Sequence, residues 1–564
     1  LKASRPKHIY KTIMDAFPFS FAQLSLGVLI AVRCAGVVLM PIADCDETFN
    51  YWEPAHFLVH GFGFQTWEYS PAYALRSYLY LLPVAGVAKV MSMVTSDKVV
   101  TFYFLRAMLG VTFSACEAFF LSRVHAKFGR SVAMVTLVLT AGSAGLLHAS
   151  ISLVPSASAA MCTLLATAFW LDGQYGYAIF VAVGSIIALW PVVVLTFVPL
   201  GIGALIDKRF GLWKVLQWGL ASSFLWISLS FGVDSYFYNT PTLTAWNFVK
   251  YNVFGSKERG SELYGVEDAK FYVLNGILNF NISLILAFVL PLVAAIYEKV
   301  CVGNDNSGRT FFGLALVSPF YLWFAFMTKI PHKEERFLFP TYPLVPFAAA
   351  LCVDRAGGIF QTMFNQRGRT TVHLLKLACI GCVLSISASR AAALNSYFHA
   401  PMQVYAHMSN HLLETHVENA TLCTGKEWYR FPTSFFLPSE GIKLQFVRNK
   451  PPEFKLADVG GQLPQHFQRA LSTWGIPDNF NDLNEEEMSR FINSQDCEYW
   501  VDLLLEEEGR HAFPEAEWER IYTLPFLDRD RSSFPGKAFF FGSRSRGLVH
   551  APYAFLKRRS HRVR

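Results

Sequence analysis

Three carboxylic acids, Asp44, Asp46 and Glu47, fall within four positions directly after an apolar stretch. Acids at the edge of a membrane helix are costly unless they are used, because burial disfavours their charged form. A carboxylate in this position could act as a general base towards a hydroxyl group. A solvated entry to a loop would give the same pattern, so the acids alone leave both interpretations open.

Aromatic residues follow the acids, namely Tyr51, Trp52 and Trp67. The flat face of a sugar ring can stack on such side chains. Trp and Tyr also gather at membrane interfaces for reasons unrelated to sugars. The aromatic residues are therefore candidates for substrate binding and, equally, for anchoring the loop at the membrane.

A second charged cluster, His332-Lys333-Glu334-Glu335-Arg336, lies between two apolar stretches. Anchoring a helix at a membrane surface takes one or two basic residues, so this mixture of charges exceeds that need. His332, Lys333 and Arg336 offer several hydrogen-bond donors, and a guanidinium can bind a phosphate through two bonds. We expect these three cations to hold a phosphate, while Glu334 and Glu335 pair with neighbouring cations.

The composition is that of a membrane protein, since 53% of the 564 residues are hydrophobic and only 16% are charged. The net charge of +7 comes from short basic clusters between apolar stretches, which argues against a nucleic-acid-binding face. The 10 cysteines form no CxxC pair, so a zinc site is not expected. The first apolar stretch lacks a small-residue cleavage site and is expected to remain as a signal anchor.

Apolar stretches long enough to cross a hydrocarbon core of about 30 Å predict about eleven transmembrane helices. They lie near residues 21–42, 99–121, 131–149, 154–171, 176–206, 213–231, 272–297, 311–328, 337–353 and 373–392. The stretch 176–206 is too long for one helix, and Trp190-Pro191 divides it in two. The stretch 73–95 contains Arg76 and Pro83, which favours a helix along the membrane surface. If it crossed instead, every later segment would be inverted.

The distribution of Lys and Arg orients these helices, with the basic residues from Lys2 to Lys11 in the cytosol. Four segments then face the lumen of the endoplasmic reticulum: the first loop 43–98, then 232–270, 329–336 and the residues after 393. We therefore predict a catalytic membrane domain over 1–392, with interfacial helices in its first loop, and a small lumenal mixed α/β domain over 393–564. In that compartment Asn419 could be glycosylated, and Cys423 could pair with Cys497.

The two charged clusters resemble motifs of glycosyltransferase family 22, the polyprenol-dependent mannosyltransferases of GT-C fold. The resemblance rests on the string HKEERF at 332–337, on DCDETFNYWEP at 44–54 and on GFQTWEYSPAY at 63–73. Through the last motif, Glu68 and Tyr69 join the candidate substrate-binding residues. The resemblance extends to 234–238, Leu263-Tyr264-Gly265, 275–276, 279–281 and 425–432, so it covers nearly the whole chain and is weakest around 443–480.

This resemblance implies an inverting transfer of mannose from dolichyl phosphate mannose. The acceptor would be a dolichyl-diphosphate-linked high-mannose oligosaccharide in the lipid bilayer, which would receive its seventh and ninth mannoses through α-1,2 linkages. One displacement with inversion needs one general base, for which we rank Asp46 first, Glu47 next and Asp44 third. The departing phosphate would be held by His332, Lys333 and Arg336.

The segment Asp44-Cys45-Asp46 also has the Asp-x-Asp form by which other sugar transferases hold a divalent metal. A lipid monophosphate leaves without the bridging metal that a diphosphate needs. We therefore expect no metal and no other cofactor.

Three alternatives remain open from the sequence, of which the third is a non-catalytic subunit of a membrane assembly that only an activity measurement would exclude. A mannosyltransferase that assembles glycosylphosphatidylinositol anchors would share the HKEERF string. A polytopic lipid or sugar transporter would carry charges inside its spans, and Arg33, Arg106 and Glu117 are such charges, although they could instead line a groove for a lipid tail. No internal repeat is visible, which argues mildly against the second alternative.

Overall fold

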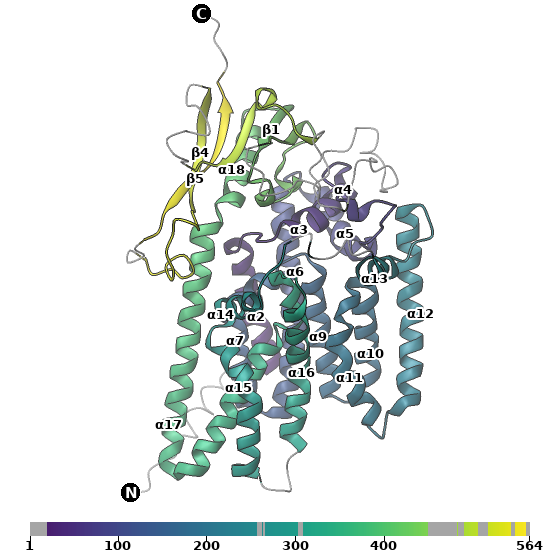
Figure 1. Ribbon diagram of the computed structural model, residues 1–564, viewed down its shortest axis with the longest axis vertical. Coiled ribbons are helices and arrows are strands. Elements are labelled where there is room, and N and C mark those ends of the chain that lie inside the picture. The colour runs from purple at the N-terminus through teal and green to yellow at the C-terminus, as the bar shows by residue number, and fades with distance from the viewer. Residues whose placement is uncertain are drawn as a thin grey trace, which may run out of the picture.

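The computed structural model describes residues 20–255, 262, 265–302, 308–448, 482, 490–505, 517–542 and 547–559. The basic residues from Lys2 to Lys11, and Leu263 and Tyr264 of the family motif, lie outside these described residues. Within them the chain is mainly helical and ends in a mixed sheet (Figure 1).

The helices form one bundle, and the sheet sits at one end of it (Figure 1). Within the described residues, 7 helical segments are long and apolar enough to cross a membrane, so the chain is a multi-pass membrane protein. They are α2 (Phe21–Leu39), α6 (Lys98–Phe128), α12 (Gly211–Tyr238), α15 (Ile282–Tyr297) with the start of η7 (Glu298–Val302), α16 (Gly308–Lys329) and the two parts Leu344–Phe364 and Thr370–Phe398 of α17 (Leu344–Phe398).

Shorter apolar helices complete the bundle. They are α7 (Arg130–Ala141), α8 (Ala144–Ala149), α9 (Pro155–Leu171), α10 (Tyr175–Gly184), η3 (Ser185–Leu189), η4 (Pro191–Val193) and α11 (Val194–Ile206). The break between η3 and η4 falls at Trp190-Pro191, where the sequence predicts that the long apolar stretch divides in two.

The charges inside the spans are used within the bundle. Arg33 of α2 and Glu117 of α6 form a buried ion pair at 2.6 Å. Arg106 donates to the carbonyls of Val37 and Met40 at the end of α2, at 3.2 and 3.0 Å. These residues therefore join α2 to α6 and do not line a groove for a lipid tail.

The helix α5 (Tyr78–Val94) begins and ends at the same end of the bundle. At its start, the backbone N–H of Tyr78 donates to Asp234 near the end of α12, at 2.9 Å. At its end it leads into α6, whose first residue Lys98 donates to the carbonyl of Ser434 at 3.4 Å. Figure 1 places α5 beside the sheet end of the bundle. This is the geometry predicted for a helix that lies along the surface.

The predicted span over 272–297 is wrong as a single helix, because it is broken at Asn281. The structure has α14 (Lys270–Phe280) before this residue and α15 after it. Asn281 adopts a φ of 43°, which Asn tolerates better than most residues. Its side chain donates to Ser387 Oγ at 2.9 Å, so α17 holds the break in place. The sequon at Asn281 is correspondingly buried.

The span predicted over 337–353 also starts later than expected, at Leu344. The residues before it form the short 3-10 helix η9 (Glu335–Thr341), which contains Pro340. Because a proline ring cannot donate a backbone hydrogen bond, a longer helix cannot run through this segment. The charged cluster therefore leads into a tight turn at the end of the bundle.

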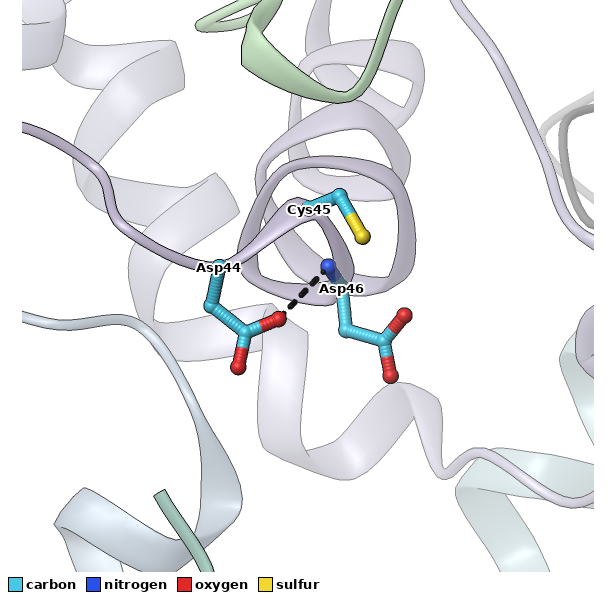
Figure 2. A group of neighbouring side chains, drawn as sticks. All are labelled: Asp44, Cys45 and Asp46. Carbon is cyan, nitrogen blue, oxygen red and sulfur yellow. Dashed lines mark hydrogen bonds between the residues drawn. The ribbon is translucent and has the colours of Figure 1, made fainter. Parts of the chain in front are cut away.

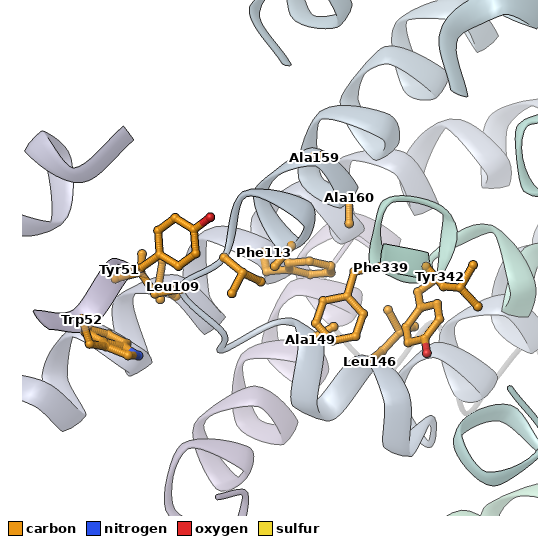
Figure 3. Close-up of a cluster of buried hydrophobic side chains, with 14 of the residues drawn as sticks. Tyr51, Trp52, Leu109, Phe113, Leu146, Ala149, Ala159, Ala160, Phe339 and Tyr342 are labelled. Atoms are coloured by element: carbon orange, nitrogen blue, oxygen red, sulfur yellow. The ribbon is translucent and has the colours of Figure 1, made fainter. Parts of the chain in front are cut away.

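A buried apolar cluster includes Tyr51 and Trp52 of the first loop together with Phe339 and Tyr342 (Figure 3). Trp52 has no exposed surface and packs against Phe102 of α6, with ring centroids 4.8 Å apart. Phe339 of η9 packs on Tyr342, which in turn contacts Phe280, at 5.2 and 4.7 Å. The first loop and η9 thus pack against the same buried apolar cluster.

The C-terminal part of the chain contains a helix and a mixed five-stranded sheet. The helix is α18 (Ala400–Glu414), and the strands are β1 (Ala420–Thr424), β2 (Ile442–Phe446), β3 (Tyr499–Leu503), β4 (Trp518–Leu527) and β5 (His550–Arg558). The strand order is β2-β1-β3-β5-β4, in which β1 pairs in parallel with β2 and β3, and β5 pairs antiparallel with β3 and β4. A disulfide joins Cys423 to Cys497, which confirms the predicted pairing.

The sheet region is docked on the first loop through Glu53 of α4 (Glu53–His60). This buried carboxylate accepts hydrogen bonds from Phe64 N at 2.9 Å, Thr433 Oγ1 at 2.7 Å, and Ser434 N and Oγ at 2.5 and 2.7 Å. Nearby, Thr48 Oγ1 donates to the carbonyl of Pro432 at 3.0 Å. The family strings around residues 44–54 and 425–432 therefore meet in space and form one structural unit.

We expect Glu53→Ala to destabilise the protein, because it removes the acceptor of four buried hydrogen-bond donors. The loss in free energy of unfolding should be about 3 kcal/mol or more, given 1–3 kcal/mol for each unsatisfied buried group. Thermal unfolding of the purified protein measures this, with the exposed Glu440→Ala as the matched control. If both variants unfolded at the wild-type temperature, Glu53 would not hold the two regions together.

Candidate active site

The first-loop acids sit on a single tight turn. Asp44 caps α3 (Cys45–Glu47), with its Oδ1 accepting a hydrogen bond from the backbone N–H of Asp46 at 2.9 Å (Figure 2). The carboxylates of Asp44 and Asp46 project to the same side of the turn in this view. The helical path continues through η1 (Thr48–Trp52) into α4, which fixes the turn in position.

Arg336 of η9 meets both acids, although it lies 290 residues further along the chain than Asp46. Its Nη2 contacts Asp46 Oδ2 at 2.5 Å, and its Nε contacts Asp44 Oδ2 at 3.2 Å. It also bonds to Glu334, and only 11% of its side chain is exposed. The structure therefore joins the two charged clusters of the sequence into one site.

The two aspartates differ in their ionisation. Burial raises the pKa of Asp44 to about 8, with the nearby Glu334 and Asp46 adding to the effect and Arg336 opposing it. Burial also opposes ionisation of Asp46, but the charges of Arg336 and Arg76 outweigh it and hold the pKa of Asp46 below its usual range. Asp46 is thus the ionised partner of Arg336, while Asp44 retains a proton near neutral pH.

Arg76 is a functional candidate that could not be identified from the sequence, where it belongs to a stretch predicted to lie along the membrane surface. Its guanidinium forms two hydrogen bonds to Glu68, at 2.7 and 3.0 Å, and one to the hydroxyl of Tyr51, at 2.7 Å. The signal available in the sequence is a single Arg just ahead of an apolar stretch in the first loop. Arg76 brings a second guanidinium to the side of Asp46.

A cavity opens beside this second guanidinium. The polar groups in its lining belong to Tyr51, Arg76, Ser77, Tyr80, Trp190 and Thr244, and apolar residues such as Leu75, Pro155 and Phe248 complete the lining. It adjoins an apolar groove lined by Ile186, Ile187, Pro191, Ile227, Leu243, Ala245, Trp246 and Val249. The two share residues from η3, η4 and α13 (Thr244–Phe254). Such a combination suits an amphiphile with a charged head and an apolar tail.

The other cations of the HKEERF string have different surroundings. His332 Nε2 lies 3.1 Å from Glu334 Oε1, and Glu334 raises the pKa of His332 against the effect of burial. Lys333 Nζ donates to the carbonyls of Glu267, Ile330 and Pro331, at 2.8, 2.5 and 3.4 Å. Lys333 thus donates to three backbone carbonyls, and none of these hydrogen bonds goes to the aspartates.

Glu47 lies in the core and not at the opening of the site. Its Oε1 accepts hydrogen bonds from Trp52 Nε1 at 2.9 Å and from Leu153 N at 3.0 Å. Burial raises the pKa of Glu47, and only 1% of the residue is exposed. A base must reach its proton directly, so the surroundings of Glu47 suit a structural role.

All four candidate aromatic residues are buried as well, and Tyr51 is only 3% exposed. Trp52 and Tyr69 have no exposed surface, and Trp67 has 4%. Tyr69 donates to the carbonyl of Asn50 at 2.7 Å, and Trp67 packs on Tyr73 with ring centroids 4.9 Å apart. These side chains shape the loop, which leaves Tyr51 as the aromatic candidate that lines the cavity.

Asp44, Cys45 and Asp46 are the described residues that could hold a metal, since their ligand atoms lie within 4.8 Å of one another. Arg336 already occupies both carboxylates. Burial raises the pKa of the Cys45 thiol well above its usual value, so it is not a ready ligand. A metal would have to displace Arg336, and independence from metals stays our prediction.

Residues 25–438 match the family described as Alg9-like mannosyltransferases. The chain is 36% identical over 556 residues to the human protein named alpha-1,2-mannosyltransferase ALG9, covering 94% of this chain and 88% of that one. It is 34% identical to the Arabidopsis thaliana protein of the same name, covering 88% and 85%.

A solved structure is similar in fold. The crystal structure of ArnT from Cupriavidus metallidurans bound to undecaprenyl phosphate has a TM-score of 0.51 and 11% sequence identity, and the match covers 85% of this chain and 92% of that one. This likeness supports the GT-C architecture predicted from the sequence.

The pKa of Asp44 predicts a pH-dependent affinity for anions. Above about pH 8 the carboxylate ionises and adds a negative charge beside Arg336. Affinity for a polyprenyl phosphodiester should then fall about tenfold, corresponding to about 1.4 kcal/mol. Binding assays between pH 6 and 9.5 measure this, and Asp44→Asn should remove the fall. A wild-type affinity that is constant across this range would contradict the assignment.

Proposed function

The chain belongs to the Alg9-like mannosyltransferase family, and we propose that it transfers mannose from dolichyl phosphate mannose to a dolichyl-diphosphate-linked oligosaccharide. The reaction is that of an alpha-1,2-mannosyltransferase, as the full-length relatives are named. The acceptor in this proposal is the high-mannose precursor of N-glycans, at the steps that add its seventh and ninth mannoses.

The observation that supports this proposal most directly is the contact between Arg336 and the two aspartates of the first loop. An inverting transfer from a lipid phosphate needs one group that accepts a proton and one that holds the departing phosphate. The contact brings both kinds of group together, and Arg76, whose charge also acts on Asp46, lines the cavity described above. A transporter would need no such pairing at this place.

In the proposed step, the acceptor hydroxyl attacks the anomeric carbon of mannose from the face opposite the phosphate. The hydroxyl proton passes to Asp46 as the new bond forms. The bond from the anomeric carbon to the phosphate oxygen breaks, and dolichyl phosphate leaves with that electron pair. Arg336, with His332 beside it, holds the resulting charge.

Donor binding would also activate the base. In the structure Arg336 holds the pKa of Asp46 low, which makes its carboxylate a weak base. A phosphate that draws Arg336 towards itself would weaken this contact and raise the basicity of Asp46. Donor binding and proton removal would thus be coupled through one guanidinium.

The cavity and groove suggest where the donor lies. The phosphate and sugar would occupy the cavity near Arg76 and Tyr51, where Glu68 keeps the guanidinium of Arg76 in place. The dolichyl chain would follow the apolar groove past Ile227 and Trp246 towards the lipid. The partners would then be two lipid-linked substrates in the same bilayer.

The topology belongs to the same proposal. We take eleven spans in the membrane of the endoplasmic reticulum, counting the shorter units α7 with α8, α9, α10 with η3, and η4 with α11. Residues 1–392 would form the catalytic membrane domain and 393–564 a lumenal domain. Contacts between residue pairs such as Glu53 and Ser434, or Tyr73 and Asp482, join segments that this topology puts in the lumen.

The first test is replacement of Asp46 by Asn, which keeps size and most hydrogen bonding but removes basicity. Turnover should fall at least roughly 100-fold, as for a lost general base, while the donor still binds. Transfer from synthetic dolichyl phosphate mannose to a defined acceptor, with the product linkage determined, measures this. Arg336→Lys should also reduce turnover strongly, because Lys lacks the planar fork.

Glu440→Gln, at an exposed position outside the site, serves as the control and is expected to keep the wild-type turnover. Near-normal turnover of Asp46→Asn would show that Asp46 is not the general base, and Asp44 would then be the next candidate. If both aspartates could be neutralised without effect, the first-loop site would not be the catalytic centre.

The topology is tested by glycosylation at Asn419, which lies exposed just before β1. In sealed microsomes Asn419 should carry a glycan that an endoglycosidase removes, and the residues after 393 should resist external protease. The matched control, Asn419→Gln, should lose the mass shift. Digestion of this region from the cytosolic side would overturn the proposed orientation.

A further inference from the structure

Neighbouring residues of the HKEERF string contact two different parts of the protein. Arg336 faces the aspartates, whereas its neighbour Glu335 accepts a hydrogen bond from Asn279 Nδ2 at 2.8 Å. Arg390 and Arg529 are the cations nearest to Glu335 electrostatically. A second charged region therefore lies behind the catalytic turn, within one residue of it in the sequence.

Three arginines from separate segments meet in this region, which we call the rear arginine cluster: Arg390, Arg430 and Arg529. Arg529, just after β4, lies over the ring of Phe398 at 4.7 Å, and Arg430 lies over Phe526 at 4.3 Å. The two rings pack against each other with centroids 5.6 Å apart. Arg390 comes from the last turns of α17.

The rear arginine cluster has unused capacity for an anion. Arg430 is paired with Glu427. By contrast, neither Arg390 nor Arg529 forms an ion pair with a carboxylate within the described part of the chain. Arg390 Nη1 donates to the carbonyl of Ala538 at 3.0 Å, but its buried Nε has no partner. Arg529 is exposed, and partial desolvation and the charge of Arg430 lower its pKa, although Asp530 and Glu335 oppose this.

The cluster also adjoins a candidate membrane span. The loop after β4 runs alongside α17 (Figure 1), and Ser389 exchanges hydrogen bonds with the backbone of Phe540 at 2.9 and 3.1 Å. Ser389 and Arg390 belong to the candidate span Thr370–Phe398. In the same loop Phe534 is 69% exposed, as expected for a ring that meets a bilayer. Clustered arginines beside such a span suit a lipid phosphate.

We propose that the rear arginine cluster binds the diphosphate headgroup of the lipid-linked acceptor. The inference rests on the proposed function, in which two polyprenyl lipids must be bound at once. The donor phosphate takes the front of the turn, at Arg336, and the acceptor diphosphate takes the rear, at Arg390 and Arg529. A diphosphate offers enough oxygens to bond to two guanidinium groups, each through its planar fork.

The proposal also gives Glu335 a role. By attracting both Arg390 and Arg529, this half-buried carboxylate keeps the guanidinium groups together before the headgroup binds. Glu335 and Arg336 are neighbours in the sequence. Binding of the acceptor headgroup near Glu335 and of the donor phosphate at Arg336 would therefore both order the same turn. Binding at the rear would thus position the catalytic arginine without contact between the two lipids.

The test compares the full-length enzyme with Arg529→Gln in nanodiscs, using Arg531→Gln as the matched control. Arg531 lies in the same loop, is more than half exposed and pairs with Asp528. Each variant receives one oligosaccharide on two carriers, a polyprenyl diphosphate and a neutral alkyl chain. Arg529→Gln should raise KM for the diphosphate acceptor about tenfold, the scale of a lost charge-assisted hydrogen bond. KM for the neutral acceptor and for the donor should stay at the wild-type value.

Two further measurements distinguish the sources of the headgroup. Binding of polyprenyl diphosphate without a glycan should weaken in Arg529→Gln but not in Arg531→Gln, and this holds even if the mannosyl transfer itself is absent. Arg529→Lys should recover part of the affinity, which a folding defect would not allow. Nanodiscs with and without anionic phospholipid test whether an ordinary phospholipid is the ligand.

The proposal would be overturned by any of three results. Equal KM changes for both acceptors that depend on anionic phospholipid would make the cluster a general lipid site. A selective rise in the donor KM would assign it to the donor. Unchanged binding of polyprenyl diphosphate in Arg529→Gln would leave the cluster a structural contact. Absence of transfer with intact diphosphate binding would instead reject the proposed function alone.

Discussion

The guanidinium of Arg336 is the interaction on which the site depends. Asp44 and Asp46 lie two residues apart on one turn, and without a cation between them two ionised carboxylates would repel each other in poorly hydrated surroundings. Arg336 contacts both. Its position therefore decides which aspartate is ionised and how basic that aspartate is. The same cation can also hold a phosphate, so the resting contact and the proposed reaction use one group for two purposes.

Much of the remaining structure holds Arg336 and the two aspartates in the positions that allow this contact. On one side, Asp234 accepts hydrogen bonds from Ser77 and Tyr78 and ties the start of α5 to α12. On the other side, Glu53 is bonded to Thr433 and Ser434, so the sheet region covers the first loop. Lys333 and Glu47 also hold the structure around the site. Lys333 donates to backbone carbonyls such as that of Glu267, and Glu47 accepts hydrogen bonds from Trp52 Nε1 and Leu153 N. The loop is thus held by buried, charge-assisted hydrogen bonds whose partners lie far away in sequence.

The sequence predicts the membrane class, most helices, the surface position of α5 and the two charged clusters, because apolar length and mixed charge are local signals. It could not predict which charges face the site. Glu47 and Lys333 have the same residue types as functional groups, and only the three-dimensional path shows Leu153 and the carbonyl of Glu267 beside them. The helix break at Asn281 could not be predicted either, because a hydrogen bond to Ser387 on another helix stabilises it.

The central claim is that Asp46 and the donor phosphate compete for Arg336, and a double-mutant cycle on donor affinity tests it most directly. The Kd of an unreactive phosphonate analogue of the donor would be measured for the wild type, Asp46→Asn, Arg336→Gln and the double variant. The account predicts that Asp46→Asn tightens binding about threefold or more in the wild-type background and has no effect beside Arg336→Gln, which is a coupling between the two sites. Equal effects in both backgrounds, or weaker binding by Asp46→Asn alone, would contradict the account.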